Sequence, residues 1–320
     1  MRSVGRVAVF STACVAVASC GSRTGLFGEE DYYGTTTSGP HGVNEAGNDT
    51  GRDAGQDVLP PIDVTPRPDV DRTDCPDADA TYIYVVTAEN ELFSFYPPDL
   101  TFKFIGNLVC PSSNGTTPFS MAVDRRGVAY VLYDVTGELY RVSTATAACV
   151  KTSFVTGQQG FQTFGMGFAS DVGGAAERLY VSDNDLNGST IRGLGWIDTT
   201  SFKLSFIGSF GTEMKRSELT GTGDGRLFAY WPNPGLGGGS HLTELNKATG
   251  QIVAQTNLPI GQSRDAFAFA FWGGDFWIFT SSGGGSTVNQ FRPMTGTTTQ
   301  PTKHPSTIVG AGVSTCAPQL

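Results

Sequence analysis

Four charged residues stand just before two predicted strands in the C-terminal half of the chain. They are the pairs Arg216 and Glu218, and Arg264 and Asp265. If both strands start at one rim of the fold, Glu218 and Asp265 become two carboxylates on one face, with the arginines beside them. Such groups more often form surface ion pairs of modest energy, here Arg216–Glu218 and Arg264–Asp265. The four residues are therefore candidates for a ligand-binding rim, and the ion-pair interpretation stays open.

A second candidate for chemistry is an Asx-rich segment. Asp183, Asp185 and Asn187, with Gly188 after them, fit the first half of a calcium-binding loop, because oxygen ligands at alternate positions wrap a hard cation. The twelfth position is Leu194 instead of the bidentate glutamate, so the loop is incomplete. The segment predicts a weak Ca²⁺ site, with a metal-free Asx turn as the alternative.

Other catalytic motifs are missing from the sequence. The three histidines, His41, His241 and His304, have no carboxylate or cysteine beside them in a motif. There is no G-x-S-x-G elbow or H-E-x-x-H pair, and the glycine-rich turns lack the Lys-Ser/Thr of a phosphate loop. The net charge of −9 argues against nucleic acid as a partner, since phosphates demand a basic surface.

The first twenty residues have the pattern of an export signal. Arg2 and Arg6 precede an apolar stretch at 7–17, which is shorter than the roughly 20 residues of a membrane-spanning helix. Val17-Ala18-Ser19-Cys20 then resembles the lipobox of bacterial lipoproteins. The resemblance implies that residues 1–19 are a signal peptide, that Cys20 carries lipid, and, with Gly21 next, that the protein is sorted to the outer membrane. An ordinary secretory signal is the alternative.

Residues 20–74 are predicted to be a disordered tether. Between 21 and 74 there are eleven acidic residues, four arginines and only three aromatic residues, with prolines between 60 and 68. Such a segment cannot bury enough apolar surface to offset its chain entropy. We therefore place the start of the folded domain at Cys75.

The cysteines also indicate export. Cys14 leaves with the signal and Cys20 takes lipid, so four remain: Cys75, Cys110, Cys149 and Cys316. An even number in an oxidising compartment predicts two disulfides, for which three connectivities exist.

A repeat organises residues 75–320. A short strand with an aromatic residue at its second place recurs five times, and these aromatic residues are 46, 50, 48 and 49 positions apart: Tyr84, Tyr130, Tyr180, Phe228 and Trp277. Each is followed by an apolar residue and a polar turn, such as Leu245 before Lys247-Ala-Thr-Gly250. Two independent patterns thus predict five units, each with the alternating pattern of several short strands.

Units of this length resemble the blades of β-propellers of the YVTN, NHL and kelch kind. The resemblance implies an all-β, five-bladed propeller over 75–320. In unit two we expect strands at 119–124, 128–134, 138–143 and 149–156. Unit one has no inner strand before Thr81, and the spare segment Ile308–Val313 would supply it and close the ring. Closure brings Cys316 near Cys75, and it places Cys110 and Cys149 on outer strands of neighbouring blades, so these are the expected pairs.

The predicted function follows from the architecture. Small and apolar residues fill the expected inner strands, as in Phe267-Ala-Phe-Ala-Phe, so we find no ring of channel carboxylates and expect no catalysis. We predict a monomeric, exported, lipid-anchored propeller that binds a protein or a glycan through its loops and rim. The alternatives are an extracytoplasmic hydrolase or lyase acting on sugar or peptide, and a structural component of the cell envelope.

Overall fold

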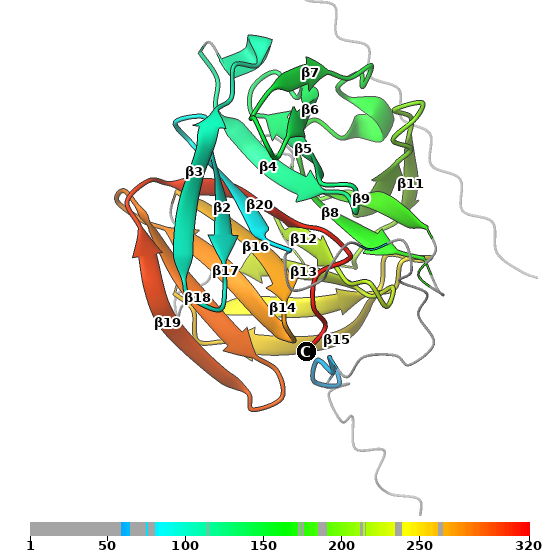
Figure 1. Cartoon of the computed structure of the whole chain (residues 1–320). Coiled ribbons are helices and arrows are strands. Elements are labelled where there is room, and N and C mark those ends of the chain that lie inside the picture. Colours follow the sequence, from blue (N-terminus) through cyan, green and yellow to red (C-terminus); the bar gives the residue numbers. More distant parts are fainter. Residues whose placement is uncertain are drawn as a thin grey trace, which may run out of the picture. The chain divides into compact units, whose positions relative to one another are not determined.

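Five four-stranded antiparallel sheets make up the folded part of the chain in a computed structural model (Figure 1). It describes residues 59–64, 75, 81–113, 115–171, 174, 176–184, 191–211, 214, 216–233, 239–261 and 265–320. From inner to outer strand, the first sheet is β20 (Ile308–Val313), β1 (Ile83–Thr87), β2 (Glu91–Tyr96) and β3 (Thr101–Asn107), and the second is β4 (Pro118–Val123), β5 (Val128–Tyr133), β6 (Leu139–Ser143) and β7 (Cys149–Lys151). The third is β8 (Phe164–Ser170), β9 (Glu177–Asp183), β10 (Leu194–Ile197) and β11 (Leu204–Gly208), and the fourth is β12 (Glu218–Gly221), β13 (Leu227–Pro232), β14 (Ser240–Leu245) and β15 (Ile252–Leu258). The fifth is β16 (Ala266–Trp272), β17 (Asp275–Ser281), β18 (Ser286–Arg292) and β19 (Thr297–His304). Two single turns of 3-10 helix are η2 (Pro111–Ser113) and η3 (Gln158–Gly160).

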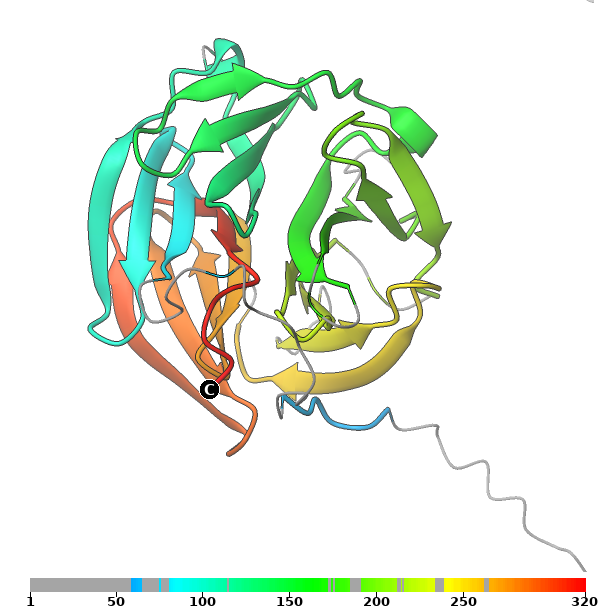
Figure 2. The ribbon, with the colours of Figure 1, turned by 45° about the vertical axis from the view of Figure 1, so that its right-hand side comes forward.

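The sheets are the blades of a five-bladed β-propeller, as the sequence predicts. They stand around one axis with the strands β4, β8, β12, β16 and β20 innermost (Figure 2). Each sheet is apolar on both faces because a neighbouring blade covers each face. Phe228 and Tyr230 of β13, for example, pack against Phe269 and Phe276 of the next blade. Most of the apolar core therefore lies between blades rather than within one sheet.

Glycines let the inner strands approach one another closely. A Cβ atom on Gly165 of β8 would lie 2.1 Å from the carbonyl oxygen of Ser217, just before β12. A Cβ atom on Gly312 of β20 would lie 2.8 Å from the backbone nitrogen of Val123 in β4. No side chain fits at such distances, so these positions need glycine. The small inner-strand residues thus serve backbone packing along the channel.

The ring is closed by the C-terminal strand, as predicted. β20, red in Figure 1, pairs antiparallel with β1, and Ile83 lies opposite Val313. The disulfide Cys75–Cys316 links residues 241 positions apart immediately beyond this strand. A second disulfide joins Cys110, which follows β3, to Cys149, which begins β7 of the neighbouring blade. Both predicted pairs are confirmed, and two disulfides are typical of proteins that fold outside a reducing cytoplasm.

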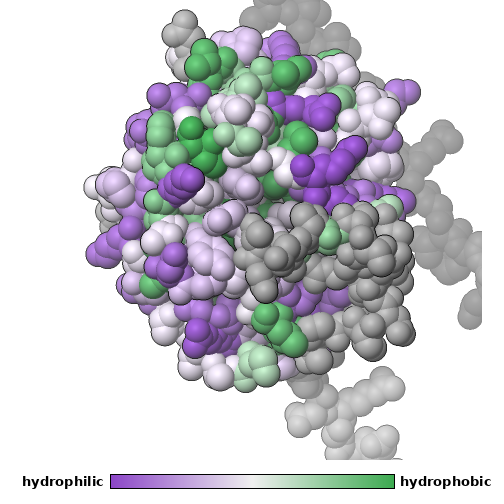
Figure 3. All heavy atoms as spheres, viewed as in Figure 1, coloured by the Kyte–Doolittle hydropathy of each residue, from purple (hydrophilic) through white to green (hydrophobic). Residues whose placement is uncertain are grey.

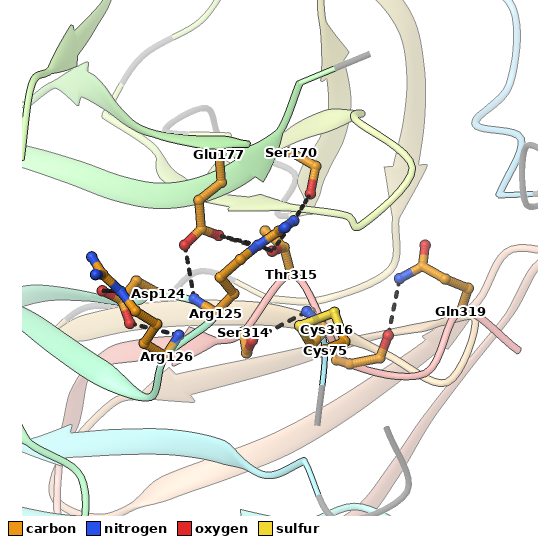
Figure 4. The surroundings of a disulfide bond; sticks show 11 residues. Cys75, Asp124, Arg125, Arg126, Ser170, Glu177, Ser314, Thr315, Cys316 and Gln319 are labelled. Carbon is orange, nitrogen blue, oxygen red and sulfur yellow. Dashed lines mark hydrogen bonds and ion pairs between the residues drawn. A yellow bond between two sulfur atoms is a disulfide. The ribbon is translucent and has the colours of Figure 1, made fainter. Parts of the chain in front are cut away.

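A polar network holds the C-terminal tail beside the first disulfide (Figure 4). Arg125, in the turn after β4, donates from Nη2 to Ser170 Oγ at 2.8 Å and from its backbone N–H to Glu177 Oε1 at 2.8 Å. Thr315 donates to Glu177 Oε2 at 2.8 Å, and the Arg125 Nε lies 3.8 Å from the same oxygen. Both charged side chains are largely buried, with 9% and 11% of their surface exposed, so the network supplies the partners that burial demands.

One stretch of the predicted tether belongs to the folded domain. Ile62 and Val64 are buried between the fourth and fifth blades, beside Leu258 and Ile260. The Asp63 carbonyl oxygen accepts a hydrogen bond from Arg226, and the Pro60 carbonyl oxygen accepts one from Gln255. The prediction that 20–74 is disordered throughout is therefore wrong for 59–64. The average composition of residues 20–74 did not indicate that Ile62 and Val64 are spaced to pack together between the fourth and fifth blades.

The outer strand of the second blade is shorter than predicted. β7 ends at Lys151 instead of continuing to Thr156. Beyond it, Thr152 still donates to the Leu139 carbonyl oxygen, but Phe154 turns inward and packs edge-on against Phe164 of the third blade. Burial of this phenylalanine between the blades takes the chain out of the sheet.

Candidate functional site

A pocket of about 230 Å³ lies at the end of the channel where the inner strands begin. We call it the channel-mouth pocket. Residues from all five blades line it: Thr117, Pro118, Phe119, Asp134, Asn184, Arg216, Glu218, Asp265, Ala266, Phe267 and Val309. The strands β4, β12, β16 and β20 start here, and β5 and β9 end here, so the antiparallel order of each blade brings these positions to one end.

Glu218, the first residue of β12, is a buried carboxyl group in this pocket. Its side chain accepts a hydrogen bond at Oε2 from Ser120 Oγ at 2.6 Å, and Ser120 itself accepts the backbone N–H of Met166 at 3.1 Å. Burial raises the pKa of Glu218 well above its usual value, and these hydrogen bonds and the charge of Arg216 only partly oppose the effect. The site therefore favours the neutral form of this carboxyl group.

Arg216 is a partly buried cation that forms no ion pair with the described residues. Its Nε is buried and has no hydrogen-bond partner among the residues that the structure describes. Its guanidinium carbon lies 5.9 Å from the centre of the Phe119 ring. Burial lowers the pKa of Arg216, while the charges of Glu218 and Asp134 act in the opposite direction. The Nε–H has thus lost water without gaining a partner in the described part of the chain.

The third blade fixes the backbone between these two residues. Asn184 accepts the Ser217 N–H at 2.7 Å and donates to the Ser217 carbonyl oxygen at 2.9 Å. The hydroxyl groups of Ser182 and Ser217 lie 2.6 Å apart. Because Asn184 uses both its amide groups in this clamp, it positions Arg216 and Glu218 and has little capacity left for a ligand.

Two aspartates complete the polar lining. Asp265 accepts the Gly283 N–H at Oδ2 at 2.6 Å, and Asp134 accepts the Val135 N–H at Oδ1 at 2.8 Å. Each carboxylate still has lone pairs for another donor. The rings of Phe119 and Phe267 are half-buried and form apolar walls. The pocket thus offers one unused cationic donor, several anionic acceptors and two aromatic surfaces.

The predicted rim is largely brought together here. Arg216, Glu218 and Asp265 line one pocket, whereas Arg264 lies outside the described residues. Arg216 and Glu218 form no ion pair within 4.0 Å, and Glu218 is buried, so the surface ion-pair interpretation is wrong for them. The reason is that Ser120 of the second blade and Met166 of the third blade lie against the carboxyl group. Asp134 and Asn184 were not among the predicted site residues, although Asp134 ends and Asn184 follows a predicted second strand, which places both at the same end.

The predicted calcium loop is only partly visible. Asp183 is buried at the end of β9, and its Oδ2 accepts the backbone N–H of Arg192 at 2.7 Å. Asp185 and Asn187 lie outside the described residues. Among the residues that are described, no group of three His, Cys, Asp or Glu side chains is placed to hold a metal ion. The Ca²⁺ site stays a prediction.

The chain was also compared with known proteins. No protein-family model matches it, and no curated protein sequence matches it. The chain is similar to several solved structures. A chain of the nidogen/laminin complex is 10% identical with a TM-score of 0.49, covering 74% of this chain and 100% of its own. Virginiamycin B lyase from Staphylococcus aureus is 14% identical with a TM-score of 0.38, covering 72% and 71%.

TolB from Acinetobacter baumannii is 10% identical with a TM-score of 0.40, covering 74% of this chain and 69% of its own. At such identities and TM-scores the similarity concerns the fold alone, and it transfers none of these proteins' roles to this chain. Within the described residues, no helix is long and apolar enough to cross a membrane.

Proposed function

We propose that this chain is a binding module that holds one sugar unit of a glycan in the channel-mouth pocket. The observation that carries the proposal is the buried Nε of Arg216, which has no partner among the described residues and lies in one pocket with the carboxylates of Asp134 and Asp265. A sugar ring both accepts and donates hydrogen bonds, so it fits a pocket with an unused donor and spare acceptors. The faces of Phe119 and Phe267 suit its apolar C–H groups.

The size of the pocket also favours a single sugar unit. Drug-sized ligands occupy roughly 300–1,000 Å³, and this pocket of about 230 Å³ lies below that range. A stable protein interface needs roughly 1,000 Å² or more with a central apolar cluster. On the side of the molecule drawn in Figure 3, hydrophobic side chains form small groups between hydrophilic ones. We therefore place a glycan before a protein partner.

A thermal-melt screen tests this function. The exported chain with Cys20→Ser, produced in an oxidising compartment, would be melted with a panel of mono- and oligosaccharides. A ligand at a hundred times its Kd adds about 2.7 kcal/mol, which gives a clear shift. Arg216→Gln should abolish the shift. Arg178→Gln is the matched control, because Arg178 lies over Trp196 on the third blade, outside the pocket. A panel without any shift contradicts glycan binding.

A second candidate function is enzymatic, and Glu218 favours it. A neutral carboxyl group that lines a pocket is the form that protonates a leaving oxygen in glycoside cleavage. Incubation with the glycans that bind, followed by an assay for new reducing ends, tests this candidate. Turnover that Glu218→Gln removes while binding persists would establish a hydrolase. Binding without turnover would favour the binding module.

Attachment of the module to a membrane is part of the proposal. Cys20 lies outside the described residues, and the support is the lipobox-like Val17–Cys20 together with the two disulfides. Mass spectrometry of the mature N-terminus should find lipid on Cys20. Cys20→Ser should move the protein from the membrane fraction into the soluble fraction of the envelope. An unmodified N-terminus would contradict the anchor.

A further inference from the structure

The proton of the neutral Glu218 can be assigned to one oxygen. Ser120 Oγ accepts the Met166 N–H at 3.1 Å and donates its own hydroxyl hydrogen to Glu218 Oε2, 2.6 Å away. Since Oε2 acts as an acceptor, the carboxyl proton lies on Oε1. A proton on Oε1 makes Glu218, which lines the channel-mouth pocket, a hydrogen-bond donor for a ligand there.

Arg216 brings the second donor to the same pocket. Its Nε–H has no partner in the described part of the chain, and Asn184 holds the backbone that joins the two residues through Ser217. The two donors flank one fixed residue, and one of them carries a positive charge. A neutral hydroxyl group would leave that desolvated charge uncompensated, whereas a carboxylate accepts both hydrogen bonds and compensates it.

We propose that the sugar unit bound in the channel-mouth pocket is a sugar acid, whose carboxylate accepts hydrogen bonds from Arg216 and Glu218. The inference rests on the glycan-binding function proposed above and specifies its ligand. The sugar hydroxyl groups then face the acceptors Asp134 and Asp265. The net charge of −9 disfavours a densely charged polyanion, so the site suits one acidic unit at the end of a glycan.

The remaining charges of the pocket orient the ligand. Asp134 and Asp265 repel a carboxylate that enters the wrong way round, and they accept hydroxyl hydrogens when the acid lies against Arg216. Arg264, next to Asp265, lies outside the described residues. When Glu218 ionises at higher pH, it loses its donor and gains a repulsive charge. Affinity for the acid should therefore fall as pH rises through the raised pKa of Glu218.

Calorimetric titration with matched sugars tests the inference on the wild-type chain. The ligands are a short oligosaccharide ending in a uronic acid, its methyl ester, and the neutral sugar of the same stereochemistry. At pH 5.5, a value between the usual carboxyl range and neutrality, we expect the acid to bind about tenfold or more tightly than the ester, because a charge-assisted hydrogen bond is lost in the ester. Equal or tighter binding of the ester overturns the sugar-acid inference and leaves glycan binding standing.

The same titration separates the two proposals and the possible sources of the carboxylate. If none of the three sugars binds, glycan binding fails and the sugar-acid inference fails with it. A blocked tripeptide with a free C-terminal carboxylate is the fourth ligand. If it binds as tightly as the sugar acid, the pocket recognises carboxylates in general, and the assignment to a sugar is overturned.

Two variants locate the donors. Arg216→Gln should remove the preference for the acid over its ester, while Arg178→Gln on the third blade should keep it. Glu218→Gln keeps an N–H donor but cannot ionise, so the acid should bind with an affinity that no longer falls between pH 5 and pH 8. An unchanged preference in Arg216→Gln, or an unchanged pH profile in Glu218→Gln, contradicts the assigned roles. The wild-type ester comparison stands even if a variant fails to fold.

Discussion

The two ends of the propeller channel each hold an arginine and a glutamate, but the two residues contact each other at one end only. At one end, which we call the closure end, Arg125 and Glu177 contact each other and share Thr315 of the C-terminal tail. At the channel-mouth pocket, Arg216 and Glu218 form no ion pair, and the Nε of Arg216 lacks a partner in the described part of the chain.

The difference separates structural from functional polar groups. A buried polar group that has its partners supports the fold, whereas one without partners costs stability and marks a place where a ligand can supply them. Burial raises the pKa of both glutamates, so burial alone does not distinguish the two ends of the channel. The two ends differ in whether the arginine has hydrogen-bond partners.

The largest expected effect concerns the disulfide at the closure end. Replacing both Cys75 and Cys316 by serine should lower the free energy of unfolding by about 4–5 kcal/mol, because the bond closes a loop of 241 residues in the unfolded chain. Denaturant unfolding under non-reducing conditions measures this loss. The Cys110–Cys149 bond closes a loop of only 39 residues and serves as the comparison. A larger loss from the shorter loop would argue against closure as the dominant effect.

The second effect is the difference in stability lost when Arg125 or Arg216 is replaced by alanine. Arg125→Ala should cost about 3 kcal/mol or more, because Glu177 stays buried without its cation. Arg216→Ala should cost less than about 1 kcal/mol, since Arg216 has a contact with the Phe119 ring but no ion pair with the described residues. Urea unfolding midpoints of the two variants give the comparison. Equal losses would remove the distinction between the two ends.

The third effect is the loss of stability when the segment 59–64 loses its packing against the blades. Ile62→Ala should cost about 2 kcal/mol by opening a cavity between the fourth and fifth blades. Val253→Ala, at a half-exposed position of β15 nearby, is the control and should be close to neutral. The measurement is again the free energy of unfolding. If Ile62→Ala is as mild as the control, the segment does not stabilise the domain.

The smallest effect is a pH dependence that Glu218 contributes. Its pKa is raised above the usual value of 4.5, so the native state holds more protons than the unfolded state above that pH. By linkage, its contribution to stability is complete below pH 4.5 and is lost as pH rises through the raised pKa. Glu218→Gln should therefore flatten the decline in unfolding free energy from pH 5 to pH 8. A parallel decline in both proteins would show that Glu218 ionises normally in the folded state.

Much of the architecture could be predicted because it depends on local patterns. The five aromatic residues from Tyr84 to Trp277 repeat at the length of one blade, since each blade needs the same buried second strand. The spare strand Ile308–Val313 could pair only with the unit that lacked an inner strand. That pairing also determined both disulfides, because it brought Cys316 to Cys75.

The candidate site could be predicted only in outline. The positions of Arg216, Glu218 and Asp265 at strand starts place them at one end of the fold, since inner strands of a propeller run in the same direction. The burial of Glu218 and its hydrogen-bond partners could not be deduced, because Ser120 and Met166, which lie against it, come from two other blades. Composition likewise concealed Ile62 and Val64, whose burial requires a gap between blades that no local pattern describes.

By itself, the sequence determined five repeated units, because periodicity is a property of neighbouring residues. With the resemblance to propeller blades it also predicted the closure of the ring, both disulfides and the end of the channel where charged residues gather. The tertiary structure alone decided which of those charges are satisfied. Partners of a buried polar group come from distant parts of the chain, so only the packed blades show that Arg125 has its anion, whereas the Nε of Arg216 has no partner among the described residues.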